Sequence, residues 1–240
     1  MTEVLVKHPR FSIYGEIHNA IDNRVYEDIY STFEKDEIVL CEHSTFKPFL
    51  ALEEKAIQHC GFDHLLDKMK GSDWIYINQK SLSLPVTCVD IRVEYGFPTA
   101  AEEVEFSQHG LEDPEACVEF IYRVISTAIA HKEKCENYPT LLPVMVKEVC
   151  DRYDEIKEML NEEESIDEIY EHFDCLVTLL RRVAGLFVDV HILEILESHL
   201  MTNSVDSPHI SIFVGARHAT SMYHILSTIY DNVEIFYKDE

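Results

Sequence analysis

Five short apolar runs constrain the fold more than any other feature of the chain, because they are rich in the β-branched and aromatic residues that favour strands. They cover residues 11–14, 38–41, 86–91, 210–214 and 233–237. Helical patterns at 23–34, 47–59 and 219–230 follow three of these runs. Strands that alternate with helices are typical of βαβ units. The sequence therefore predicts an α/β fold, with a mixed, largely parallel sheet flanked by helices.

The middle of the chain has no strand pattern from residue 113 to about residue 200 and is predicted to be helical. Asp113 and Pro114 are a typical helix start, with an N-cap followed by proline at the first helical position. A second helix is predicted over 143–160. A third begins after Ser165 and is long enough that Gly185 is a candidate position for a kink or a break. We therefore expect an α/β core formed by 1–112 and 205–240, with a helical insertion or subdomain over 113–204.

The chain is strongly acidic, and this limits the partners that it can bind. It has 240 residues with 20 Lys and Arg against 45 Asp and Glu, a formal net charge of −25. Such a charge repels phosphate backbones, so nucleic-acid binding through a basic surface is excluded. Residues 148–174 alone hold twelve acidic and two basic side chains. A run of this kind is typical of a solvated helix face, and the alternative is an acidic surface that binds a partner.

The cysteines and the hydropathy pattern predict a soluble protein in the cytoplasm. Seven cysteines are present, with no CxxC pair, and most of them lie in apolar periodic segments, which is typical of reduced thiols. The first residues lack the apolar region of a signal peptide. No apolar run approaches the ~20 residues that span a bilayer, so we expect no membrane partner.

Charged side chains follow four of the predicted strands at the point where each strand should end. They are Glu16, His18, Glu42, His43, Asp90, Arg92, Arg217 and His218. The carboxyl ends of parallel strands form the edge of an α/β sheet at which ligands bind. The sequence therefore predicts one site, built from residues about 200 positions apart.

Spacing separates the residues that can share this site. Glu16 and His18 are two apart in extended chain and so point to one side, and Gly15 before them allows a sharp turn or a close approach. Glu42 and His43 are adjacent and point to opposite faces, and we favour Glu42 for the site. Arg217, like His43, is expected to point away from the site or to support the side chains that contact the ligand.

Asp90 and Arg92 have two interpretations. Asp90 can orient a histidine or bind a metal while Arg92 holds an anionic group, or the two form a structural ion pair. Asp189 is a further candidate, because a carboxylate within the apolar run of a helix needs a partner. Sharper signatures are absent from the sequence, which has no HExxH, no GxSxG and no glycine-rich phosphate loop.

The order of these motifs resembles one known superfamily. The matching residues are Gly15-Glu16-Ile17-His18, Glu42, Asp90-Ile91-Arg92 and Gly215-Ala216-Arg217-His218. The chain is similar to the erythromycin esterase-like, ChaN-like and TraB/TIKI-like proteins. The sequences of its motifs look most like those of uncharacterised members encoded by large DNA viruses. The resemblance covers about 10–95 and 205–237. It implies a mixed sheet with a helical excursion near the site and, for a viral member, the host cytoplasm.

Members of this superfamily differ in activity, so the resemblance leaves the reaction open. Some hydrolyse macrolide esters with a histidine-activated water, some are metal-dependent proteases, and some bind haem. We hypothesise a hydrolase for an ester or peptide bond in a small-molecule or peptide substrate. His18 or His218 would be the base, Glu16 and Glu42 would orient it or hold a metal, and Arg92 would stabilise negative charge.

A metal site from His18, Glu42 and His218 would suit Mn, Zn or Co by ligand type. Two alternatives remain open. The first is a non-catalytic module for a small ligand or for haem, although neither an axial ligand nor an apolar haem face is identified in the sequence. The second is an acidic interaction protein that works through its helical region.

Overall fold

The computed structural model describes two compact units. It covers residues 2–16, 37–42, 86–138, 140–162, 165–201 and 208–237. The sheet unit is formed by 1–90 and 191–240, and the helical unit by 91–190. The helical unit thus begins and ends earlier in the chain than the predicted 113–204. The helices predicted at 23–34 and 47–59 lie outside the described residues.

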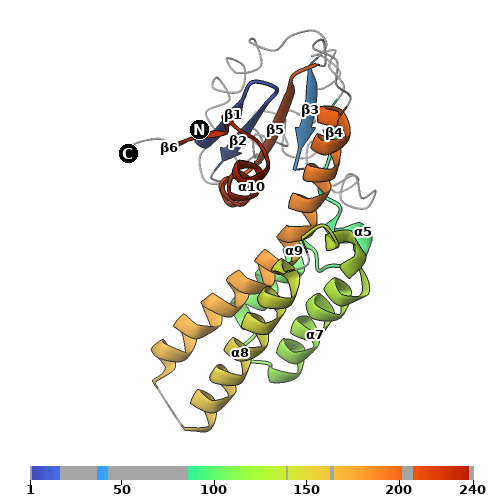
Figure 1. Cartoon of the computed structure of the whole chain (residues 1–240). Helices are drawn as coiled ribbons and strands as arrows, with labels where there is room; N and C mark the ends of the chain where they lie inside the picture. Colours follow the sequence, from blue (N-terminus) through green and yellow to red (C-terminus); the bar gives the residue numbers. More distant parts are fainter. Residues whose placement is uncertain are drawn as a thin grey trace, which may run out of the picture. The chain divides into compact units, whose positions relative to one another are not determined.

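The sheet unit holds one mixed sheet, as the sequence predicts. Its strands are β1 (Thr2–His8), β2 (Phe11–Glu16), β3 (Ile38–Cys41), β4 (Val86–Cys88), β5 (Ile210–Gly215) and β6 (Glu234–Tyr237). Across the described residues the order is β4-β3-β5-β2-β1-β6. β4, β3, β5 and β2 run parallel, while β1 pairs antiparallel with β2 and β6. Figure 1 shows β2, β5 and β3 side by side.

Strand β1 was not predicted. It forms a hairpin with β2, in which His8 pairs with Phe11 across a tight turn at Pro9 and Arg10. Its residues Val4 and Val6 are buried, whereas Leu5 between them is partly exposed and Lys7 is exposed. This period of two is a strand pattern. The alternation is short, however, and polar residues flank it on both sides.

Helix α10 (Ala216–Ile229) follows β5 without a loop and packs against β1 and β2. Gly15 of β2 makes this close packing feasible. A Cβ atom at position 15 would lie 2.7 Å from Ala219 Cβ and 2.9 Å from Ala216 Cα, and contacts this short do not occur in proteins. The backbone of Gly15 does not have a positive φ. Its glycine is therefore required by the approach of the helix and not by a turn.

The helical unit contains the predicted middle helices. The helices are α5 (Arg92–Tyr95), α6 (Ala100–His109), α7 (Pro114–Ala130), the 3-10 helix η1 (Lys132–Cys135), α8 (Leu141–Asn161) and α9 (Ile166–Met201). Asp113 caps α7, its side chain accepting a hydrogen bond from the Ala116 N–H, as predicted. The break considered at Gly185 does not occur, since Gly185 lies inside α9, a helix of 36 residues. The last part of α9, from His191 onward, belongs to the sheet unit.

An aromatic core explains why the helical unit begins before residue 113. Phe97 precedes α6 and Phe106 lies within it, and both are buried in the same cluster as Phe173 and Phe187 of α9. The Phe97 and Phe187 ring centroids are 5.0 Å apart, and those of Phe106 and Phe173 are 5.1 Å apart. The segment around α5 and α6 therefore folds with the helices and not with the sheet.

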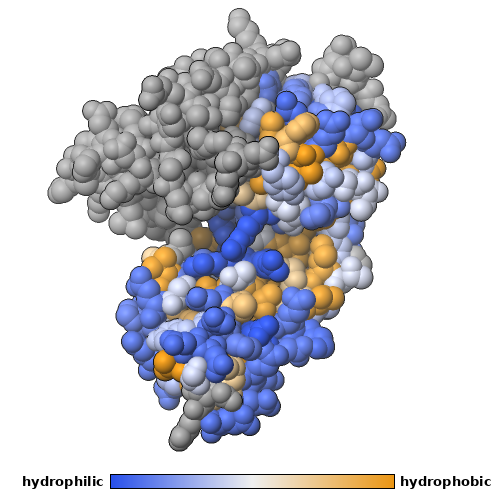
Figure 2. All heavy atoms as spheres, turned by 90° about the vertical axis from the view of Figure 1, so that its left-hand side faces the viewer, coloured by the Kyte–Doolittle hydropathy of each residue, from blue (hydrophilic) through white to orange (hydrophobic). Residues whose placement is uncertain are grey.

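The acidic run of the helical unit faces solvent, as its pattern predicts. Ten of its acidic residues are described, and all are exposed: Glu148, Asp151, Asp154, Glu155, Glu158, Glu162, Asp167, Glu168, Glu171 and Asp174. In Figure 2, hydrophilic residues dominate the visible surface of this unit, which is the lower part of the view. Three basic side chains, Lys147, Arg152 and Lys157, form ion pairs with neighbours one helical turn away. The acidic run is thus a solvated face of α8 and of the start of α9.

The turn between β1 and β2 holds the end of α9 within the sheet unit. The Arg10 guanidinium donates hydrogen bonds to the carbonyl oxygens of Leu200, at 2.8 Å, and of His199, at 3.2 Å. The carbonyl oxygens in the last turn of a helix accept no hydrogen bond from the helix itself, so a cation beside them is favourable. The Arg10 N–H in turn donates to His8 Nδ1, at 3.2 Å.

His8 is expected to make stability depend on pH. Burial lowers the pKa of His8, and the charge of Arg10 and the nearby His209 lower it further. Below about pH 6.5, the ordinary pKa of histidine, the unfolded chain takes up a proton that folded His8 resists, so the free energy of unfolding falls as pH is lowered. His8→Asn keeps an acceptor for the Arg10 N–H but removes the titration. Urea unfolding from about pH 7.5 to about pH 5.5 should show a shallower pH dependence for the variant, and equal slopes would contradict this role of His8.

Candidate functional site

The carboxyl ends of the parallel strands meet at one edge of the sheet. Glu16, the last residue of β2, pairs with Gly215, the last residue of β5. Cys41, the last residue of β3, pairs with Phe213 of β5 and with Cys88 of β4. The strand ends that carry the predicted site residues are thus adjacent in space, although they come from distant parts of the chain.

Glu42 and His218 form a carboxylate–imidazole pair at this edge. Glu42 follows β3 directly, and its N–H donates to the Phe213 carbonyl oxygen at 2.8 Å. Its Oε1 lies 3.4 Å from His218 Nε2, and the two side chains are only 7% and 15% exposed. The pair is therefore largely shielded from water, which strengthens the electrostatic interaction between a carboxylate and an imidazolium.

The second carboxylate oxygen of Glu42 is bound at the start of α10. Glu42 Oε2 accepts a hydrogen bond from the N–H of Gly215, the N-cap residue of α10, at 2.8 Å. The N-terminus of a helix carries a partial positive charge that favours an anion. Because His218 lies in the first turn of the same helix, Glu42 binds both the helix start and its histidine. This fixes the orientation of the carboxylate toward the imidazole.

Close packing places His218 beside Glu42. The first turn of α10 lies against β2 at Gly15, where Ala216 and Ala219 leave room for only a hydrogen atom. Ala219 and Met222 on this face of α10 are fully buried. The small residues at this contact therefore determine how far His218 stands from the sheet edge.

The other predicted site residues have different surroundings. Asp90 is half-buried and follows β4 by two residues. Arg92 is not part of a strand end but is the first residue of α5 in the helical unit. Arg217 is exposed on α10, consistent with its expected direction. His18 and His43 lie outside the described residues, and of Glu16 only the backbone is described.

Asp189 is buried in α9, with 4% of its surface exposed. It belongs to the helical unit, within the segment 183–190 in which every residue is buried. A helix segment that is buried on all sides is a core element.

Within the part of the chain that the structure covers, no group of three His, Cys, Asp or Glu side chains is arranged to hold a metal ion. Glu42 and His218 supply two of the three predicted ligands, and the third, His18, is outside that part. Their spacing is relevant, because two donor atoms that each lie about 2.1 Å from a tetrahedral metal ion are about 3.4 Å apart. A charge-assisted hydrogen bond is shorter, about 2.7–2.9 Å. The 3.4 Å spacing of the pair is that of an ion pair and also matches the spacing of two ligands of one ion.

A polar network inside the sheet was not predicted. Ser211 Oγ donates to the buried Glu37 carboxylate, and Ser12 Oγ lies 3.0 Å from His209 Nε2. Burial raises the pKa of Tyr14, and hydrogen bonds with Ser12 and Ser211 partly offset this rise. The two serines are paired residues of β2 and β5. The sequence signal for this network was a serine at the second position of each of the two apolar runs, 11–14 and 210–214. Since its groups bond to one another, the network is a structural feature of the sheet.

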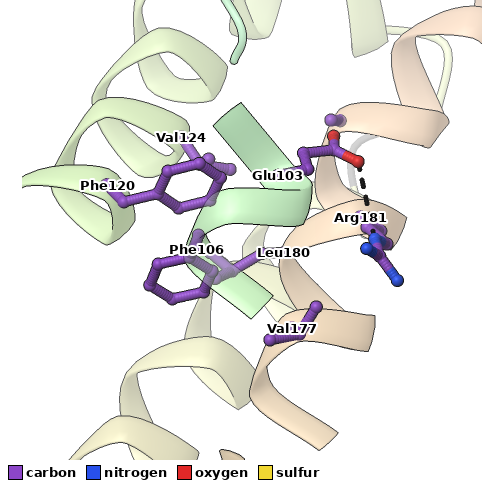
Figure 3. A pocket seen from close by; sticks show the side chains of 8 residues that line it. Glu103, Phe106, Phe120, Val124, Val177, Leu180 and Arg181 are labelled. Carbon is purple, nitrogen blue, oxygen red and sulfur yellow. Dashed lines mark ion pairs between the residues drawn. The ribbon is translucent and has the colours of Figure 1, made fainter. Parts of the chain in front are cut away.

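The helical unit contains a small pocket that offers little chemistry. It is lined by Glu103, Phe106, Phe120, Val124, Val177, Leu180, Arg181 and Ala184. Figure 3 shows the aromatic and aliphatic side chains around it, with the Glu103 carboxylate directed at Arg181. These two charges form an ion pair of 3.4 Å. With its charged groups paired and its other residues apolar, the pocket holds no general base or nucleophile.

Comparisons with known proteins assign the chain to no family. No family model, no curated protein and no solved structure matches the chain. Among the helices that are described, none combines the length and the hydropathy that crossing a membrane would require.

Proposed function

We propose that the protein is a hydrolase that acts through an activated water at the carboxyl edge of its sheet. The observation that carries this proposal is the Glu42–His218 pair, with 3.4 Å between carboxylate and imidazole and little exposure to solvent. A histidine oriented by a carboxylate is a common general base. Hydrolases are among the members of the erythromycin esterase-like, ChaN-like and TraB/TIKI-like superfamily that the motif order resembles.

In this proposal His218 removes a proton from water, and Glu42 stabilises the imidazolium that results. Glu42 suits this role because its other oxygen is bound to the Gly215 N–H, so the carboxylate does not rotate away as charge develops. The attack of the activated water on a carbonyl carbon would cleave an ester or peptide bond. Glu16, His18 and Asp90 are the further side chains that the sequence predicts at this edge of the sheet.

A divalent metal is the second part of the proposal. His18, Glu42 and His218 would hold Mn, Zn or Co, and the 3.4 Å between Glu42 Oε1 and His218 Nε2 fits two ligands of one ion. Such an ion lowers the pKa of a bound water and so supplies hydroxide near neutral pH. In this form of the proposal the three side chains would hold the ion and orient its water, and His218 would be a ligand and not the base.

The test combines a substrate panel with added metals. Purified protein, treated with a chelator and then supplied with Mn, Zn or Co, is assayed on generic esters and peptides. We expect turnover of at least one substrate class. We also expect a metal-dependent rise in melting temperature that is smaller for His18→Ala than for His224→Ala, an exposed histidine on the same helix as His218. Turnover without any metal effect would retain the hydrolase and remove the metal, whereas no turnover and no metal effect would overturn both.

A further inference from the structure

Two cysteines lie opposite one another at the carboxyl edge of the sheet. Cys41 is the last residue of β3 and Cys88 the last of β4, and the register of the two parallel strands pairs them directly. Paired residues of neighbouring strands have side chains on the same face of the sheet. Both residues are present as thiols. The two sulfur atoms thus belong to one small area, although 46 residues separate them in the chain.

We propose that Cys41 and Cys88 form a reversible disulfide when the protein meets a small disulfide such as oxidised glutathione. Neighbouring strands lie about 4.7–4.9 Å apart, within the Cα separation of about 4.4–6.8 Å that disulfides span. Directly paired side chains must move slightly closer for the bond to form. β4 permits this, because it has only three residues and, among the described strands, it pairs with β3 alone.

Exposure determines the order of the two steps. Cys88 is partly exposed on the last strand of the described sheet, whereas Cys41 is fully buried. The Cys88 thiolate attacks one sulfur of oxidised glutathione, forming a mixed disulfide and releasing one glutathione thiolate. The Cys41 thiolate then attacks the Cys88 sulfur and releases the second glutathione. Two protein thiols are oxidised and one glutathione disulfide is reduced to two thiols, so electrons and atoms balance.

The remaining described cysteines lack this arrangement. Burial raises the pKa of Cys117 to about 11, and Cys117 lies on helix α7, where it has no strand partner. Cys135 is buried in the core of the helical unit. Cys150 and Cys175 are exposed on α8 and α9. Neither of these two is paired in register with another cysteine, so they are expected to react singly. The inference does not rest on the proposed function, because it needs only the strand register.

The experiment is peptide mapping of the whole protein after incubation with oxidised glutathione. Trypsin places Cys41 in the peptide 36–55, Cys88 in 81–92 and Cys60 in 56–68. We expect peptide 36–55 linked to 81–92, with the loss of two hydrogen atoms, and separation of the two by dithiothreitol. Cys88→Ser, a substitution in the outermost of the described parallel strands, should abolish the linked pair. Cys150→Ser should leave it unchanged and serves as the matched control.

Three results would overturn the inference. The first is glutathione retained on Cys88 with peptide 36–55 unmodified, which would mean that Cys41 does not reach the mixed disulfide. The second is a link from 81–92 to 56–68, which would assign the bond to Cys60. The third is the absence of any link at glutathione ratios that fully modify exposed Cys150 and Cys175. Mapping of the unaltered protein distinguishes these results even if a cysteine variant fails to fold.

Discussion

Replacing Glu42 with glutamine is expected to lower the turnover of the best substrate by about 100- to 10,000-fold, the usual contribution of general acid–base catalysis. The glutamine oxygen can still accept the hydrogen bond of the Gly215 N–H, and its NH2 group can donate to His218 Nε2. The contacts of Glu42 are therefore retained, and only its negative charge is lost. Without that charge, a protonated His218 is less stable and the water loses its base.

The experiment separates this role from a structural one. Glu42 also caps α10, so a purely structural residue would tolerate glutamine with normal turnover and an unchanged melting temperature. Glu234→Gln, on exposed β6, is the matched control for loss of one carboxylate from the sheet unit. If Glu42 and His218 act as one unit, the double variant Glu42→Gln/His218→Ala should be no slower than His218→Ala alone. Additive losses would contradict a shared role.

Phe187→Ala is expected to lower the free energy of unfolding of the helical unit by about 3–5 kcal/mol, the usual cost of truncating a buried phenylalanine. Phe187 is 0% exposed, and its ring contacts Phe97 and Tyr95, with centroids 5.0 and 6.0 Å away. Its removal leaves a cavity between α9 and the segment before α6. Because typical domains are stable by only about 5–15 kcal/mol, the variant should lose much of its resistance to urea.

Urea unfolding followed by helical circular dichroism measures this effect. Tyr122→Ala is the control, since Tyr122 lies on α7 of the same unit and is 72% exposed. A surface change of this kind usually alters stability by about 0.5 kcal/mol or less. Equal midpoints for both variants would show that Phe187 is not part of a tightly packed core. Comparison of near-ultraviolet and far-ultraviolet signals checks whether the two units unfold separately.

Much of the fold was predictable because its elements carry strong local signals. β3 has the predicted bounds 38–41, and β5 and β2 extend the predicted runs by one or two residues. Buried parallel strands read as continuous apolar runs, which makes them easy to recognise. β1 shows the opposite case, because only two of its described side chains, Val4 and Val6, are buried. Gly185 was misleading because the intrinsic cost of glycine in a helix is small against the burial of its neighbours Ala184 and Leu186.

The sequence predicted which residues follow the strands at the sheet edge, but not the contacts that they make there. Charged residues after apolar strands must lie at the sheet edge, and strand register then brings distant positions together, as for Glu16 and Gly215. The Glu42–His218 pair depends instead on the entry of α10 and on the N–H of Gly215, which are tertiary features. Arg92 was placed at a strand end because the run 86–91 is apolar. β4 stops at Cys88, and the chain then enters a helix.

The contact at Gly15 gives the chain a signature that sequence searches could use. Catalytic residues recur in unrelated proteins, so Glu42 and His218 alone discriminate poorly between lineages. Position 15 is restricted for a steric reason, since any side chain would meet Ala216 and Ala219 at 2.7–2.9 Å. A homologue that keeps the short distance between β2 and α10 must keep a glycine before its first acidic residue and small residues at both helix positions. Such a pattern of small residues can survive after the surrounding sequence has diverged.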